Sequence, residues 1–144
     1  MLKLLTEICL VRGEIDESFQ CLQNYAICAH TNDLELSFLV SLYFLGSHQF
    51  EVAEQWCQAV VNATIGTNGQ METMYRFQSQ IHLVLLKLRN EDVQAAEDLV
   101  RCMTPPTISS MHCLYNLVQA LISAGKNEIQ KTKYALSLRK GLIL

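Results

Sequence analysis

The sequence has few of the residues that interrupt helices. Among 144 residues there are two prolines, adjacent at Pro105 and Pro106, and six glycines. Because proline removes a backbone donor and glycine weakens regular structure, this scarcity leaves room for long helices and for little disorder. The period-two alternation that strands require does not persist anywhere. We therefore expect an all-α chain that forms a single domain over residues 1–144.

Charge is scarce and unevenly distributed. Only 17% of the residues are charged, and the formal net charge of −3 gives no general attraction to nucleic acid. Residues 126–140 carry +4, so the remainder carries about −7 (−3 minus +4). This basic segment is either a contact face or a solvated helix face near a C-terminus, where the dipole favours cations. Its charges are Lys126, Lys131, Lys133, Arg139 and Lys140 against Glu128.

Motifs that carry chemistry are also missing. The six cysteines include no C-x-x-C pair, and most fall on predicted apolar helix faces, so we expect reduced thiols and a cytoplasmic or nuclear protein. Cys28 with His30, and His112 with Cys113, lack the paired spacing of a zinc site. There is no phosphate-binding loop. We expect no enzyme activity, no metal, no cofactor and no small-molecule substrate.

The first residues do not predict a membrane segment. Lys3 and Glu7 interrupt the apolar run, and no small-residue cleavage site follows it. We therefore expect neither a signal peptide nor a membrane span.

Apolar residues that recur at steps of three and four predict eight helices joined by short turns. Residues 33–46 are apolar nearly all round, which predicts a helix covered on several sides, with Asn32 as its cap. We expect Gly125 to separate the last two helices. The predicted ranges are 2–12, 14–29, 33–46, 49–64, 70–89, 93–103 (capped by residues 90–92), 108–124 and 127–140.

An internal repeat links the second helices of the four predicted pairs. Each carries apolar or small residues at steps of +3, +4 and +3, and the second member is always small, which lets two helices approach closely. The four rows begin 35, 43 and 36 residues apart, and a two-helix unit of about 34 residues is typical of tetratricopeptide repeats. The rows are Ile15/Ser18/Leu22/Tyr25, Phe50/Ala53/Cys57/Val60, Val93/Ala96/Val100/Met103 and Ile129/Thr132/Leu136/Arg139.

On these residues the chain resembles the tetratricopeptide repeat proteins. Gly13, Gly46 and Gly125 precede the second helix of their pairs, whereas the third pair has Arg89-Asn90 there. The segment AEQWCQAVVN is also similar to part of the meiotic crossover-promoting proteins built from degenerate repeats of this kind. The resemblance implies a solenoid of four αα-hairpins in a right-handed superhelix. Its units would span about 1–30, 31–66, 67–106 and 107–144.

The resemblance further implies a concave groove lined by the first helices. The alternative is that the residues assigned to this groove pack against the neighbouring repeat. Because Lys3 is the one basic residue among them, we expect an apolar or helical protein segment rather than a carboxylate tail of a chaperone. The predicted groove residues are Lys3, Glu7, Val40, Tyr43, Leu83, Tyr115 and Gln119.

The first predicted helix starts at Met1 without a polar cap, and the last one continues into the apolar residues Gly-Leu-Ile-Leu. Solenoids need polar terminal faces. We therefore expect a piece of a longer solenoid, self-association, or a covering subunit. The leading hypothesis is a non-enzymatic adaptor subunit of an intracellular assembly. The alternative is a nucleic-acid-associated or meiotic chromosome-linked protein that uses the basic last helix.

Overall fold

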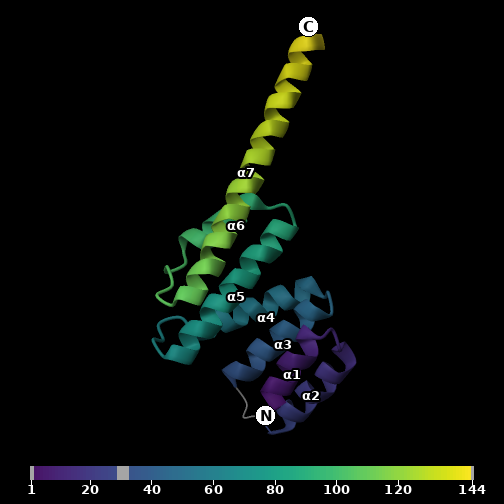
Figure 1. Ribbon diagram of the computed structural model, residues 1–144, viewed down its shortest axis with the longest axis vertical. Helices are drawn as coiled ribbons and strands as arrows, with labels where there is room; N and C mark the ends of the chain where they lie inside the picture. Colours follow the sequence, from purple (N-terminus) through teal and green to yellow (C-terminus); the bar gives the residue numbers. More distant parts are fainter. Residues whose placement is uncertain (1, 29–32, 144) are drawn as a thin grey trace. The chain divides into compact units, whose positions relative to one another are not determined.

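The computed structural model describes residues 2–28 and 33–143, and the side chains of residues 2, 3, 27, 28, 132, 135 and 137–143 lie outside this description. Within these ranges the chain forms seven helices and no strand (Figure 1). The prediction of an all-α fold is confirmed, and the predicted number of eight helices is wrong. The helices are α1 (Leu2–Val11), α2 (Ile15–Cys28), α3 (Leu34–Gly46), α4 (Phe50–Ala63), α5 (Gln70–Arg89), α6 (Val93–Arg101) and α7 (Ser109–Ile143).

The chain groups into two compact units, residues 1–83 and 84–144. Unit 1 holds α1 to α4 and the first part of α5. Unit 2 holds the last residues of α5 together with α6 and α7. Helix α5 runs through the boundary without interruption.

Helix α3 is the centre of unit 1. It contacts α1, α2 and α4, and every one of its residues is buried or half-buried. Leu39 is completely buried, and the ring of Phe38 lies 4.8 Å from that of Tyr75 on α5. A helix that is apolar on all sides requires such covering. The expectation that residues 33–46 are enclosed on several sides is thus confirmed.

The pairs α1–α2, α3–α4 and α5–α6 share the same turn. One residue in each turn has left-handed backbone geometry: Gly13 (φ 76°), His48 (φ 60°) and Glu91 (φ 61°). The next residue donates its N–H to the carbonyl five positions earlier, which is the hydrogen bond of a Schellman motif. These bonds are Glu14 to Cys9 (2.8 Å), Gln49 to Phe44 (2.9 Å) and Asp92 to Lys87 (2.9 Å).

In the repeated rows of the first three pairs, the second and third members are buried and the first members are half-buried. Their small members Ser18, Ala53 and Ala96 are all completely buried. Each lies five residues after the left-handed residue of its turn, so the spacing is constant when it is counted from that residue. The spacing from the glycines varies because glycine occupies the left-handed position in one turn of the three.

Gly46 has a different function from the one expected of it. It is the last residue of α3, and a β-carbon there would lie 3.1 Å from Leu10 Cδ2 and 3.4 Å from Ile15 Cδ1. The glycine therefore lets the end of α3 approach α1 and the start of α2 closely. The left-handed position of this turn belongs to His48.

Side chains cap two helices at their N-termini. Asp33 accepts a hydrogen bond from the Leu36 N–H (3.1 Å), and Asp92 accepts one from the Ala95 N–H (3.0 Å). Each satisfies a backbone donor that has no partner inside the helix. The predicted cap of α3, Asn32, lies outside the described residues, and the cap of that helix is Asp33.

The predicted break at Gly125 does not occur. Helix α7 continues through this position as one helix of 35 residues, and a β-carbon on Gly125 would lie 3.0 Å from Val93 Cγ2 on α6. The glycine serves close packing between two helices rather than a turn, which removes the predicted eighth helix. The prediction that the fourth repeated row belongs to the second helix of a pair is therefore wrong. Ile129 and Leu136 of this row are exposed.

Candidate partner-binding surfaces

The residues predicted to line a groove fall in both units. In unit 1, Glu7 on α1 and Val40 and Tyr43 on α3 are half-buried. Lys3 belongs to α1, and its side chain lies outside the described part. In unit 2, Tyr115 is half-buried and Gln119 is exposed, both on α7.

Two of these residues take part in packing. Leu83 is buried on α5, with 3% of its surface exposed, so its assignment as a partner-contacting residue is corrected. The ring of Tyr43 lies 5.5 Å from Phe19 on α2 and 5.3 Å from Phe44. Such tilted and edge-on arrangements are the ones aromatic pairs favour. Tyr43 thus links α3 to α2.

Helix α1 carries an exposed apolar row that the sequence did not single out. Leu4, Ile8 and Val11 are 59%, 41% and 88% exposed. Steps of four and three place them on one face of the helix. Scattered exposed aliphatic residues are ordinary, but an aligned row is typical of a contact surface. We call these three residues the α1 row.

Helix α7 carries a second exposed apolar face. Leu117, Leu121, Ile129 and Leu136 are all exposed, and at 100° per residue they fall within about 120° of the helix circumference. We call these four residues the α7 face. The basic residues Lys131 and Lys133 are exposed on the same helix. This surface therefore combines aliphatic side chains with positive charge.

Helix α6 packs on α7 within unit 2. Ala96 and Val100 of α6, and Val118 and Ile122 of α7, are buried. At the edge of this contact, Lys126 donates a hydrogen bond to Glu97, which also pairs with Arg101 at 2.9 Å. The bond from Lys126 is the main cause that lowers the pKa of the Glu97 carboxyl.

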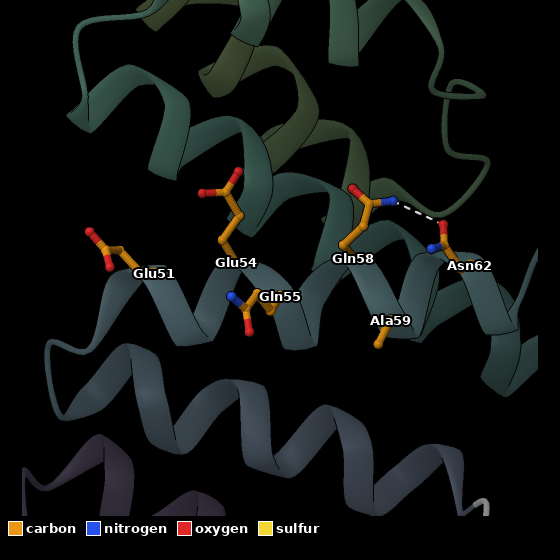
Figure 2. A pocket seen from close by; sticks show the side chains of 6 residues that line it. All are labelled: Glu51, Glu54, Gln55, Gln58, Ala59 and Asn62. Carbon is orange, nitrogen blue, oxygen red and sulfur yellow. Dashed lines mark hydrogen bonds between the residues drawn. The ribbon is translucent and has the colours of Figure 1, made fainter.

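Helix α4 presents a shallow polar depression (Figure 2). Figure 2 shows Glu51, Glu54 and Gln58 on the side of α4 that is turned away from α3. Gln58 donates a hydrogen bond to Asn62 (3.0 Å). Carboxylates and amides on one helix face can form hydrogen bonds with a polar partner. Gln55 and Ala59 complete the lining.

In the described part of the chain, the thiols of Cys9 on α1 and Cys21 on α2 lie next to each other. No group of three or more His, Cys, Asp or Glu residues there could hold a metal ion. Cys57 is completely buried, and this burial raises its pKa to about 11, which keeps it a protonated, inert thiol. His112 and Cys113 are exposed neighbours on α7, whereas the side chain of Cys28, and all of His30, lie outside the described residues.

Two polar atoms of α5 are buried without a hydrogen-bond partner, Ser79 Oγ and His82 Nδ1. Burial lowers the pKa of His82, because the interior disfavours the imidazolium ion. By contrast, the hydroxyl of the half-buried Tyr25 on α2 lies 2.8 Å from Glu35 Oε2 and 3.2 Å from Asp33 Oδ2. Burial and the bond to Glu35 raise the pKa of Tyr25.

No described helix combines the length and apolar character needed to cross a lipid bilayer. No protein-family model, curated protein or solved structure matches this chain. The candidate surfaces are therefore the α1 row and the α7 face, defined by their own exposure and chemistry.

Proposed function

We propose that this chain is a non-enzymatic protein-binding scaffold, a subunit of a larger intracellular assembly. The observation that carries the proposal is the presence of aligned, exposed aliphatic side chains on α1 and on α7. Each of these residues leaves apolar surface in water, and its burial by a partner yields about 25 cal/mol per Å². Surfaces of this kind mark protein contacts more often than catalytic centres.

The repeated turn supports a tetratricopeptide-like architecture for this scaffold. Three helix pairs have a left-handed residue in the turn, the same Schellman hydrogen bond and a buried small residue five positions later. A hairpin that recurs with constant internal geometry is the building block of a helical solenoid, and solenoids present extended binding surfaces. The proposed solenoid rests on this recurrence, and its right-handed superhelix rests on the resemblance to tetratricopeptide repeats.

A cytoplasmic or nuclear location agrees with the state of the thiols. All five cysteines with described side chains are free. Free cysteine is typical of reducing compartments.

Affinity capture from cell extract, followed by mass spectrometry, tests the proposal. The wild-type chain is compared with Ile8→Gln/Val11→Gln on α1 and with Leu117→Gln/Leu121→Gln on α7. Matched controls change exposed polar residues of neighbouring surface, Gln20→Ala on α2 and Asn116→Ala on α7. We expect protein partners that both controls retain and that at least one apolar variant loses.

Two outcomes contradict the proposal. One is an identical set of captured proteins for all five chains. The other is capture that disappears after nuclease treatment and weakens steeply with salt, which indicates nucleic-acid binding through the basic part of α7. Circular dichroism of each variant shows whether its helices are retained, so that loss of binding is not confused with loss of folding.

A further inference from the structure

The contact between α6 and α7 indicates what the rest of α7 binds. Helix α6 has nine residues and begins at Val93, which lies against Gly125 of α7. Residues 126–143 of α7 continue beyond this point, over about 27 Å at 1.5 Å per residue. Helix α6 therefore packs along one part of a much longer helix.

The apolar surface of α7 continues past Gly125. Val118 and Ile122 are buried, whereas Ile129 and Leu136 are 41% and 51% exposed. Steps of four, seven and seven place all four on one side of the helix, as the repeat of a helix–helix seam requires. Ile129 and Leu136 thus extend the seam that α6 uses, and we call them the distal seam.

The charges beside the seam are mostly positive. Residues 126–140 carry a net charge of +4, and at 100° per residue Lys126 and Lys133 border the apolar row. Within the chain, Lys126 donates to Glu97, an acidic residue of α6. The α6 contact is therefore an aliphatic row with an acid beside it, packed on an aliphatic row with a lysine beside it.

We propose that the distal seam of α7 binds an acidic amphipathic helix of a partner protein. This helix lies along α7 beyond the start of α6, places aliphatic side chains on Ile129 and Leu136, and directs carboxylates towards Lys126 and Lys133. The inference rests on the proposed function as a protein-binding scaffold, and it specifies the partner segment by charge and shape. Recognition of an amphipathic helix by such a row is a recurrent mode of binding.

Other occupants fit this surface less well. A second copy of α7 brings its own charge of +4 to the same seam, and like charges across a helix pair oppose association. A membrane surface favours an apolar helix face that includes aromatic residues, whereas Leu117, Leu121, Ile129 and Leu136 of the α7 face are all aliphatic. The exposed aromatic residue Tyr134 lies about 160° from Leu136 around the helix.

Fluorescence anisotropy with a defined probe tests the proposal on the full chain. The probe is a labelled synthetic helix with leucines at seam positions and glutamates beside them, long enough to cover residues 126–143. A matched probe carries lysines in place of the glutamates. Vesicles of phosphatidylcholine with phosphatidylserine, and a DNA duplex, represent the other two ligand classes.

We expect the acidic helix to bind and the lysine helix not to bind. Ile129→Gln/Leu136→Gln weakens binding at least tenfold, and Lys133→Glu weakens it several-fold, with a smaller effect at high salt. Tyr134→Gln on the same helix, and Ile8→Gln/Val11→Gln on α1, leave the dissociation constant within about twofold. Circular dichroism confirms that each variant keeps its helices.

The proposal is overturned if the two probes bind equally, if the acidic probe does not bind, or if Tyr134→Gln weakens binding as much as the seam variant. It is also overturned if the seam variant abolishes binding to vesicles or DNA, or abolishes self-association in sedimentation. If the seam fails these tests while captured proteins still depend on the α1 row, the scaffold proposal stands without the acidic helix. If neither surface affects any captured protein, both proposals fail.

Discussion

Gly125 of α7 lies directly against Val93 of α6, so that a β-carbon on the glycine would come within 3.0 Å of Val93 Cγ2. Glycine in the middle of a helix is unfavourable by about 0.8–1.0 kcal/mol relative to alanine. Its presence inside a helix of 35 residues is explained by the close approach of the two helices. The same relationship predicts how substitutions at the two positions depend on each other.

Gly125→Ala should stabilise unit 2 by about 1 kcal/mol when Val93 is also replaced by alanine, because helix propensity then acts without the contact. With Val93 present, the new methyl group overpacks the contact, which typically costs about 1–3 kcal/mol and cancels or reverses the gain. Urea unfolding of the four chains measures this coupling. Ala124→Gly, at the exposed neighbouring position, should destabilise both backgrounds equally. Equal effects of Gly125→Ala in the two backgrounds would show that the contact is unimportant.

The left-handed turn residues lead to a second prediction. Glu91 has a φ of 61°, a conformation that is unfavourable by about 1–2 kcal/mol for residues other than glycine. Glu91→Gly should therefore stabilise the protein, by up to about 1 kcal/mol after the greater freedom of glycine in the unfolded chain is subtracted. Gly13→Ala, at the equivalent position of the α1–α2 turn, should destabilise it by a similar amount.

Thermal and urea unfolding measure both effects. Asn90→Gly is the matched control, because Asn90 precedes the left-handed residue and gains nothing from glycine. If Asn90→Gly stabilises the protein as much as Glu91→Gly, the gain does not come from the left-handed geometry.

The first three helix pairs could be predicted because packing imposes a period on the sequence. The rows that start at Ile15, Phe50 and Val93 each place a small residue where two helices meet, and those residues are buried. The fourth row, from Ile129, has the same period, but its members with described side chains, Ile129 and Leu136, are exposed. Periodicity identifies an apolar face, but it does not tell whether this chain or another molecule covers it.

Glycine was a poor guide to the turns for a physical reason. A helix glycine is required either where φ is positive or where another element approaches the backbone closely. Gly13 belongs to the first kind, and Gly46 and Gly125 belong to the second. In the α3–α4 and α5–α6 turns the left-handed position holds His48 and Glu91, and nothing in their residue types reveals this. The α1 row was missed because exposure depends on tertiary packing.

The repeated small residues lead to a third prediction. Ala53 on α4 is completely buried, so Ala53→Leu inserts a side chain where there is no space and should destabilise the fold by about 1–3 kcal/mol or more. Ala59→Leu changes an exposed residue of the same helix and should stay within about 0.5 kcal/mol. Urea unfolding compares the two variants. Equal destabilisation would mean that the repeated row is not the packing surface of α4.

The buried imidazole of α5 leads to a prediction about pH. Burial lowers the pKa of His82 in the folded protein below its ordinary value of 6.5, so the unfolded chain takes up the proton first. The stability that depends on neutral His82 is fully present above pH 6.5. It declines as the pH falls below 6.5 towards the folded-state pKa, by at most about 1.4 kcal/mol per pH unit for one proton.

Urea unfolding between pH 7.5 and 5 measures this decline. His82→Leu removes the titrating group and should flatten the profile over that range, while His112→Gln, at an exposed position of α7, should keep the wild-type slope. Ser79→Ala, which removes the second unpartnered polar atom of α5, should raise stability by about 1 kcal/mol at every pH. If His82→Leu has the same dependence of stability on pH as the wild type, the acid sensitivity comes from other groups, because the substitution removes only the proton-binding site of His82.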